Sequence, residues 1–130
     1  MITGFVAGAF DLLHVGHIHL LAECKSYCDE LIVAIQVNPN SERIEKNKPI
    51  ESLMERFLKV GSIRYVDSIV VYETEADLTL LLKHLQPDIR FLGSDYRGTG
   101  KPITDPFLVP IRFIDSLPIH TADIRKRIKK

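Results

Sequence analysis

His14 and His17 are the residues of this sequence best suited to chemistry on a phosphate. They lie three residues apart in the segment GAFDLLHVGH (residues 8–17), where we expect a helix to begin, so both side chains should share one helix face. The free N–H groups and the dipole of a helix N-terminus attract anions. Two imidazoles there could donate hydrogen bonds to phosphate oxygens as negative charge develops on them. The segment therefore predicts a site that handles a phosphate.

Two glycines and an aspartate accompany the histidines in this segment. Gly8 allows the backbone to approach a ligand closely, and Gly16 removes side-chain bulk where a nucleotide backbone would lie. Asp11 has two interpretations, as a cap of the coming helix or as a residue near a metal ion.

Two lysines further along the chain form a second candidate group. Lys46 and Lys48 alternate in a charged loop, and alternate residues of an extended segment face the same side. Lysine supplies a compact charge for phosphate, so the loop could close over a triphosphate. The alternative is a solvated charged loop.

A third candidate group follows the fourth expected strand. Tyr96 could stack on a base, and Asp95 could accept a hydrogen bond from an exocyclic amine. Ordinary loop packing is the alternative for both residues. His19 and His84 have no partner at a comparable spacing and are predicted to be surface residues.

The elements that position these residues follow from the apolar pattern. Short apolar runs alternate with amphipathic segments, which predicts an α/β fold with an open, parallel, five-stranded, Rossmann-like sheet and helices on both faces. Strands are expected over 2–8, 31–35, 66–72, 89–92 and 108–114, and helices over 15–28, 50–62, 75–85 and 121–128. Ligands of such sheets bind beyond the carboxyl ends of the strands, where the candidate residues fall.

Length, charge and cysteine content limit the class of protein. The 130 residues predict a single domain, residues 1–130. Seventeen basic residues balance seventeen acidic ones, which argues against a duplex nucleic-acid binder. The sequence has neither an apolar run long enough for a membrane span nor a basic N-terminal leader, so we expect a cytoplasmic protein without a membrane partner. Cys24 and Cys28 are interpreted as helix-packing residues.

Residues 8–17 resemble the H-x-G-H signature of the nucleotidyltransferase superfamily, and the longer match resembles its cytidylyltransferase group. The resemblance to glycerol-3-phosphate cytidylyltransferase-like proteins continues along most of the chain. The further matching blocks are K-x-K at 46–48, ER at 55–56, IRYVD at 63–67, GSDY at 93–96 and TADIR at 121–125. One such block is only moderately specific, but this series in this order is highly specific.

The resemblance implies transfer of CMP from CTP to a small phosphorylated alcohol, with release of pyrophosphate and with Mg²⁺ bridging the nucleotide phosphates. It implies catalytic roles for His14, His17, Lys46 and Arg64, although Arg64 could instead form a structural ion pair with Asp67. It also implies a homodimer with residues 64–71 near the interface. The nucleotide-binding residues that it implies are Gly8, Ala9, Phe10, Asp11, Gly16, Lys48, Gly93, Asp95, Tyr96, His120 and Thr121.

The sequence departs from the family pattern before the last expected helix. Asp115, Pro118 and His120 stand where the family usually has Arg, Gly and Ser, while Thr121 is kept. Protonated His120 could restore part of the missing positive charge.

The acidic stretch 73–77 is similar to that of sugar-phosphate adenylyltransferases of the heptose pathway. Two alternatives therefore stay open: an ATP-dependent enzyme acting on a sugar phosphate, and a catalytically silent nucleotide-binding module.

Overall fold

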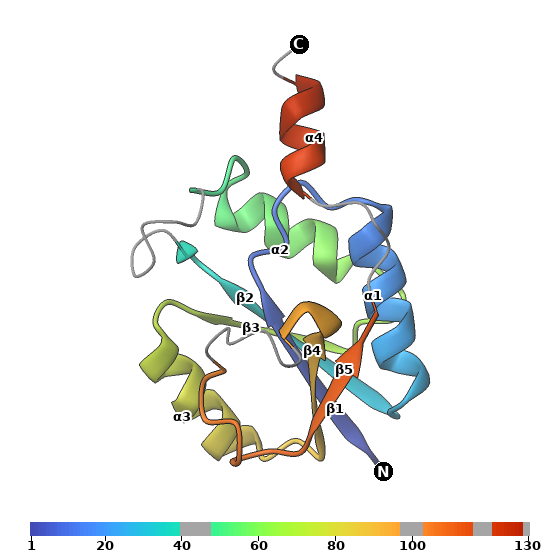
Figure 1. Ribbon diagram of the computed structural model, residues 1–130, viewed down its shortest axis with the longest axis vertical. Helices are drawn as coiled ribbons and strands as arrows, with labels where there is room; N and C mark the ends of the chain where they lie inside the picture. The colour runs from blue at the N-terminus through green and yellow to red at the C-terminus, as the bar shows by residue number, and fades with distance from the viewer. Residues whose placement is uncertain (40–47, 97–102, 116–120, 129–130) are drawn as a thin grey trace.

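The computed structural model describes residues 1–39, 48–96, 103–115 and 121–128. Within these residues it contains a five-stranded, fully parallel sheet with the order β3-β2-β1-β4-β5 (Figure 1). The strands are β1 (Thr3–Gly8), β2 (Glu30–Gln36), β3 (Ser68–Tyr72), β4 (Ile89–Gly93) and β5 (Ile111–Ile114). The predicted fold class is confirmed.

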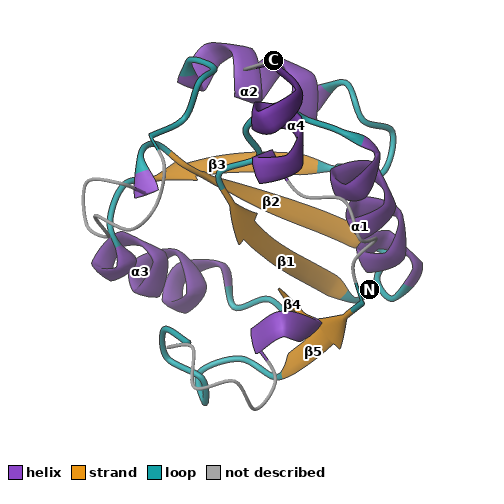
Figure 2. Cartoon of the chain, turned by 45° about the horizontal axis from the view of Figure 1, so that its top comes forward, coloured by secondary structure: helices purple, strands orange, loops and turns teal. Residues whose placement is uncertain are grey.

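Helices cover both faces of the sheet because its central strands are apolar on both sides. In β2, Leu31, Val33 and Ile35 pack in the core shared with α1 (Val15–Ser26) and α2 (Leu53–Gly61). The intervening Ile32 and Ala34 pack in the core on the side of α3 (Glu75–Leu85). Figure 2 shows α1 and α2 on one side of the sheet and α3 on the other. Among the helices of the described residues, including α4 (Thr121–Ile128), none has the length and hydropathy needed to cross a bilayer.

Four elements begin later than their apolar patterns predict: β1 by one residue, β3 by two, and α2 and β5 by three each. α2 begins at Leu53, three residues after the predicted start, because Ser52 and Glu55 form a capping box with hydrogen bonds of 3.1 and 2.9 Å. β5 begins at Ile111 and not at Leu108, since Pro110 has no N–H for a ladder and the Leu108 N–H bonds to Asp105 in a turn.

The two cysteines lie at the end of α1, away from its N-terminus. Cys24 is fully buried in the core, and Cys28 is half-buried beyond the last helical residue, so only Cys24 packs as part of the helix. Burial raises the pKa of the Cys24 thiol to about 12 and also raises the pKa of Cys28. Both thiols are free.

The strand order reverses between β1 and β4. The chain runs outward from β1 through β2 to β3 and then returns to β4 on the other side of β1. Val6 lies opposite Phe91, so Gly8 and Gly93 end the two strands side by side. A reversal of this kind opens a crevice at the carboxyl edge, which is where open α/β sheets bind ligands.

Candidate active site

His14 and His17 lie together at the N-terminus of α1, as predicted. His14 is the N-cap residue, and its Nδ1 accepts a hydrogen bond of 3.0 Å from the N–H of buried Gly16. His17 returns the contact, because its Nδ1 accepts the backbone N–H of His14 at 3.1 Å. The centroids of the two rings are 4.1 Å apart. The two imidazoles thus form a reciprocal capping box in the place usually taken by serine and glutamate.

This arrangement selects one tautomer for each ring. A neutral imidazole whose Nδ1 accepts a hydrogen bond carries its proton on Nε2. Burial and then the neighbouring His14 lower the pKa of His17 to about 4, and Asp11 opposes them only weakly. His17 is therefore a neutral Nε2–H donor at physiological pH, which suits it to stabilise charge on a phosphate oxygen.

The loop between β1 and α1 packs against the histidines through a buried aromatic ring. Phe10, expected to bind nucleotide, is 4% exposed and packs in the core with its ring centroid 5.6 Å from that of His17. Phe10 and Leu12 have φ values of 53° and 50°, in a region that residues other than glycine seldom occupy. The residues on both sides of Asp11 thus have a left-handed backbone conformation.

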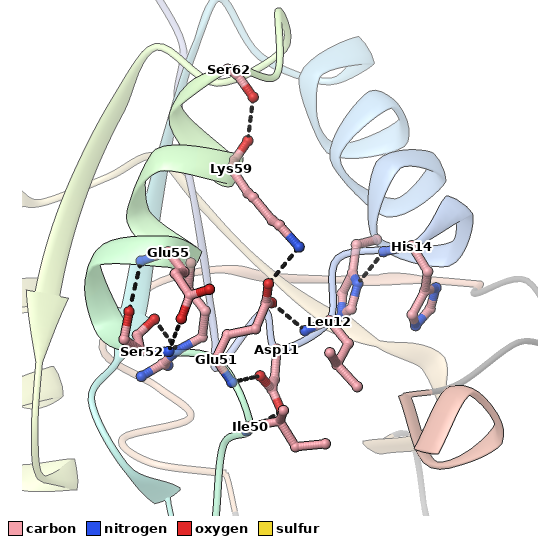
Figure 3. A network of polar contacts seen from close by, with 11 residues as sticks. Asp11, Leu12, His14, Ile50, Glu51, Ser52, Glu55, Lys59 and Ser62 are labelled. Carbon is pink, nitrogen blue, oxygen red and sulfur yellow. Dashed lines mark hydrogen bonds and ion pairs between the residues drawn. The ribbon is translucent and has the colours of Figure 1, made fainter. Parts of the chain in front are cut away.

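Asp11 does not cap α1, so that interpretation is wrong. Its two carboxylate oxygens each accept a backbone N–H at 2.9 Å, one from Ile50 and one from Glu51 (Figure 3). His14 takes the cap position, since it lies directly before the first helical residue. Asp11 also belongs to no cluster suited to a metal, because the described residues hold no group of three histidine, cysteine or acidic side chains that could ligate one.

Arg56 holds the carboxyl edge together, and sequence reasoning missed this role. Its guanidinium is 2% exposed and donates to the carbonyl oxygens of Ala9 at 3.1 Å and of Gln36 and Val37 at 2.7 Å. These carbonyls follow β1 and end β2, so one side chain of α2 fixes both strand ends. The charged neighbour Glu55 makes this stretch look like a solvent-facing helix surface, which conceals the buried arginine.

A cavity of about 200 Å³ opens on the α3 side of the carboxyl edge. Gly8, Ala9 and Tyr96, all predicted from the sequence, contribute to its wall. Arg90 and Glu75, which were not predicted, lie there as well. We call this space the β1–β4 cavity.

The β1–β4 cavity contains a buried cation facing an acidic neighbour. Arg90 is 4% exposed and donates to the carbonyl of Thr104, whose hydroxyl donates to Glu75 at 2.9 Å. Burial lowers the pKa of Arg90, while the charge of Glu75 acts in the opposite direction. The sequence did not predict Arg90 as a site residue, because it lies within the apolar run of β4, where the pattern alone predicts an inward-facing aliphatic residue.

Arg64 is not brought to the histidines within one chain. It precedes β3 and so lies at the amino edge of the sheet, whereas His14 lies at the carboxyl edge. Arg64 is exposed and donates to the Tyr65 hydroxyl at 2.9 Å. The alternative ion pair with Asp67 is wrong, because Asp67 bonds instead to Lys25 at 2.6 Å.

The remaining predicted residues are placed only in part. Gly93 ends β4, and Asp95 and Tyr96 belong to the short 3₁₀ helix η2 (Ser94–Tyr96). Thr121 begins α4, and Lys48 is exposed. Lys46 and His120 lie outside the described residues. Of the two histidines thought to be on the surface, His84 is exposed and His19 is half-buried.

The parallel sheet and the paired histidines at its carboxyl edge define a protein of the nucleotidyltransferase superfamily. More narrowly, the chain belongs to the cytidylyltransferase-like family, whose sequence model matches residues 5–104.

Curated relatives include proteins of two kinds. The chain is 33% identical over 129 residues to the bifunctional protein HldE of Campylobacter curvus, which covers 96% of this chain and 27% of that protein. It is 38% identical over 95 residues to the FAD synthase of Thermococcus sibiricus, covering 73% of this chain and 62% of the relative. The chain therefore spans only part of the length of these relatives.

Solved structures agree with the fold. A lipopolysaccharide core biosynthesis protein from Thermoplasma volcanium superposes with a TM-score of 0.72 and 29% identity over 90% of this chain and 98% of that one. A pantoate-β-alanine ligase from Francisella tularensis shares the fold. It superposes with a TM-score of 0.59 and 21% identity over 98% of this chain and 69% of that one.

Proposed function

We propose that this chain is an adenylyltransferase that joins the AMP part of ATP to a sugar phosphate and releases pyrophosphate. The observation that carries the proposal is the pair of imidazoles at the N-terminus of α1, each with its Nδ1 occupied by a backbone N–H. Both rings then offer an Nε2–H donor beside a helix N-terminus, a suitable place for a phosphate.

In the proposed reaction an oxygen of the acceptor phosphate attacks the α-phosphorus of ATP. A new phosphorus–oxygen bond forms, the bond from the α-phosphorus to the bridging oxygen breaks, and pyrophosphate leaves with that oxygen. His14 and His17 donate hydrogen bonds to the oxygens of the α-phosphate, on which charge increases in the transition state. The protein contributes positioning and charge stabilisation and forms no covalent bond to the substrate.

ATP and a sugar phosphate are favoured over CTP and glycerol phosphate, the leading sequence expectation. FAD synthase is named for a product that contains an adenylyl group, and the structural neighbour is named for the synthesis of a lipopolysaccharide core, which is a saccharide. Several relatives share the name HldE, and the acidic stretch 73–77 resembles adenylyltransferases of the heptose pathway. These relatives support the alternative better than the main expectation.

The β1–β4 cavity is the proposed acceptor site. Arg90 supplies a buried guanidinium, the side chain best shaped to grip a phosphate with paired hydrogen bonds. Glu75 and Gln36 supply oxygens and an amide that suit sugar hydroxyl groups. A phosphate-bearing polyol therefore matches the cavity's chemistry better than an apolar acceptor does.

The nucleotide is proposed to lie across the crevice between β1 and β4. Gly16 at the start of α1 and Gly93 at the end of β4 bring no side chain to this crevice, and Tyr96, which also lines the β1–β4 cavity, is proposed to bind the base where the two sites meet. Lys46, Lys48, Asp95, His120 and Thr121 remain proposed nucleotide residues on sequence grounds. Mg²⁺ remains an expectation tied to the nucleotide's phosphates, because the described side chains do not themselves form a metal-ligand set.

A homodimer is part of the proposal. Arg64 lies at the amino edge of its own sheet, and α1, which separates that edge from His14, has 12 residues and so is about 18 Å long. A catalytic role for Arg64 would therefore require a second copy to bring it to the site.

Pyrophosphate release is the direct test of the proposed function. ATP, CTP, GTP and UTP would each be paired with heptose and hexose phosphates, glycerol-3-phosphate and FMN. We expect turnover with ATP and a sugar phosphate, and none in the double variant His14→Ala/His17→Ala. Turnover with CTP and glycerol-3-phosphate would restore the first expectation. Nucleotide binding without pyrophosphate release from any pair would instead indicate a silent binding module.

A further inference from the structure

The loop that carries His14 adopts a conformation that its own sequence does not favour. Phe10 and Leu12, neither of them glycine, both have positive φ values, of 53° and 50°. Such conformations persist only where surrounding contacts impose them. For Phe10 the constraint is burial in the core, whereas Leu12 is only partly buried. Something else must hold the backbone at Leu12.

Two carboxylates connect this loop to the segment before α2. Asp11 accepts the N–H groups of Ile50 and Glu51, and Glu51 Oε1 accepts the N–H of Leu12 at 2.6 Å (Figure 3). Each segment therefore supplies a carboxylate to the backbone of the other, across about 40 residues of sequence. We call this pair of residues, Asp11 and Glu51, the carboxylate clasp.

The charge of Glu51 is balanced outside the loop. Its side chain is almost completely buried, and its second oxygen pairs with Lys59 in the last turn of α2. That contact raises the pKa of Lys59. Lys59 therefore neutralises Glu51 while leaving Oε1 to hold Leu12, so the charge and the hydrogen bond can be separated by mutation.

We propose that Glu51 is a positioning residue for nucleotidyl transfer, which fixes the backbone at Leu12 and thereby the orientation of the His14–His17 pair. His14 lies two residues beyond Leu12, and its backbone N–H sets the tautomer of His17. A change of backbone direction at Leu12 would move that N–H and both Nε2 donors. The same clasp anchors residues 50 and 51, so the segment following Lys48 is held in register with the histidines.

Three substitutions separate the hydrogen bond from the ion pair. Glu51→Ala removes both, Glu51→Gln keeps an oxygen for the Leu12 N–H but no charge, and Lys59→Met keeps the carboxylate but removes its counter-ion. Glu51→Asp keeps the charge and withdraws the oxygen from Leu12, so it replaces Glu51→Ala if that variant does not fold. Each is measured below its own melting temperature for kcat, for the nucleotide KM and, by long-range ¹H–¹⁵N NMR, for the imidazole tautomers.

We expect kcat of Glu51→Ala to fall about ten- to a hundredfold with little change in the nucleotide KM, as when reacting groups are misplaced. Its spectra should show His14 and His17 exchanging between tautomers. Glu51→Gln and Lys59→Met should keep kcat near wild type and a single Nε2–H tautomer.

An unchanged kcat and a single tautomer in Glu51→Ala would overturn the proposal, since a merely structural role lowers the melting temperature alone. Equal losses of kcat in all three variants would also overturn it. The inference rests on the proposed function only for its kinetic arm. If wild type releases no pyrophosphate from any nucleotide, the proposed function fails and the tautomer spectra still decide the role of Glu51.

Discussion

At the scale of single residues, the imidazoles of His14 and His17 each combine an observed structural role with the proposed chemical one. Each Nδ1 accepts a backbone N–H at the start of α1, which stabilises the helix N-terminus. In the neutral rings the proton is thereby placed on Nε2, the nitrogen that the proposed mechanism uses as a donor. Fold and chemistry are coupled at this point, and substitutions there must be judged on both.

His14→Ala and His17→Ala should each lower kcat by at least about a hundredfold, because each removes one donor to the developing charge. The loss of the N-cap side chain in His14→Ala should cost about 1 kcal/mol of stability as well. Pyrophosphate release and thermal unfolding measure the two effects, with His84→Ala, an exposed histidine, as the control. Near-normal turnover in either folded variant would show that the histidine substituted in it is not catalytic.

The free energy of unfolding should depend on His17 in mildly acidic solution. The pKa of His17 is about 4 in the folded chain and 6.5 in an ordinary environment, so the unfolded chain takes up the proton first. The contribution of His17 to the free energy of unfolding is therefore nearly constant above pH 6.5. It falls by roughly 2–3 kcal/mol as the pH decreases from 6.5 to about 4. Urea unfolding at several pH values should show this slope in wild type and a weaker one in His17→Asn. An identical slope in that variant would assign the effect to other groups.

Arg90→Met should raise the KM for the phosphorylated acceptor at least about tenfold, because it removes a charged hydrogen-bond donor from the β1–β4 cavity. The KM for ATP should change little, since the α-phosphate is proposed to lie at the N-terminus of α1, on the face of the sheet opposite α3. Arg112→Met, on the neighbouring strand β5 and exposed, serves as the control. Equal changes in both KM values would contradict the proposal that Arg90 belongs to an acceptor site separate from the nucleotide site.

At the scale of elements, β1 is packed too tightly to carry a side chain at Gly4. A Cβ atom there would lie 2.5 Å from the Phe91 ring and 2.9 Å from Cys28 Sγ. The same atom at Gly61, the last residue of α2, would meet only the tip of Ile69 at 3.4 Å. The two glycines therefore serve different purposes, close packing in the sheet at Gly4 and the end of a helix at Gly61.

Gly4→Ala should destabilise the protein by about 1–3 kcal/mol through overpacking. Gly61→Ala should be neutral or slightly stabilising, since alanine is the better helix former. Chemical denaturation of both variants measures the difference. A Gly4→Ala protein as stable as wild type would contradict this prediction. It would show that the side chains of Phe91 and Cys28 can shift to accommodate a Cβ atom at little cost in free energy.

Most elements could be predicted from the sequence because local patterns determine them. The apolar run of β2 and the spacing within α3 identified both correctly. α2 is three residues shorter at its start than predicted, because the capping box of Ser52 and Glu55 and not Pro49 sets that start, and one residue shorter at its end. Arg56 and Arg90 could not be predicted as buried. Their partners are carbonyl groups, those of Gln36 and Thr104 among them, far away in the sequence and brought near only by the folded sheet.

At the scale of the whole molecule, one side remains apolar and exposed. β3 is an edge strand, and Met54 and Leu58 on the adjacent α2 are 72% and 65% exposed. A groove beside this edge is lined by apolar residues that include Leu53, Val71 and Leu80, together with Glu73, Asp77 and His84. Patches of this kind commonly mark interaction sites, and a second copy of the chain is the occupant that the proposed role of Arg64 requires.

Light scattering at micromolar concentration should give the mass of a dimer. Leu58→Glu should shift the protein to a monomer without unfolding it, because the side chain is exposed in the single chain. Phe107→Glu, at a still more exposed position in the loop before β5, at the opposite edge of the sheet from β3, should leave the dimer intact. A monomeric mass for wild type would refute the dimer and with it a catalytic role for Arg64.

The placement of the two cysteines makes the protein convenient for site-specific spectroscopy. Thiol reagents attack the thiolate, and burial holds both native thiols in their protonated form near neutral pH. Cys24 is also ten residues along α1 from His14, about 15 Å by helix geometry. A cysteine introduced on an exposed surface near the carboxyl edge would thus be the preferred site for a fluorophore or a spin label, with both native cysteines retained.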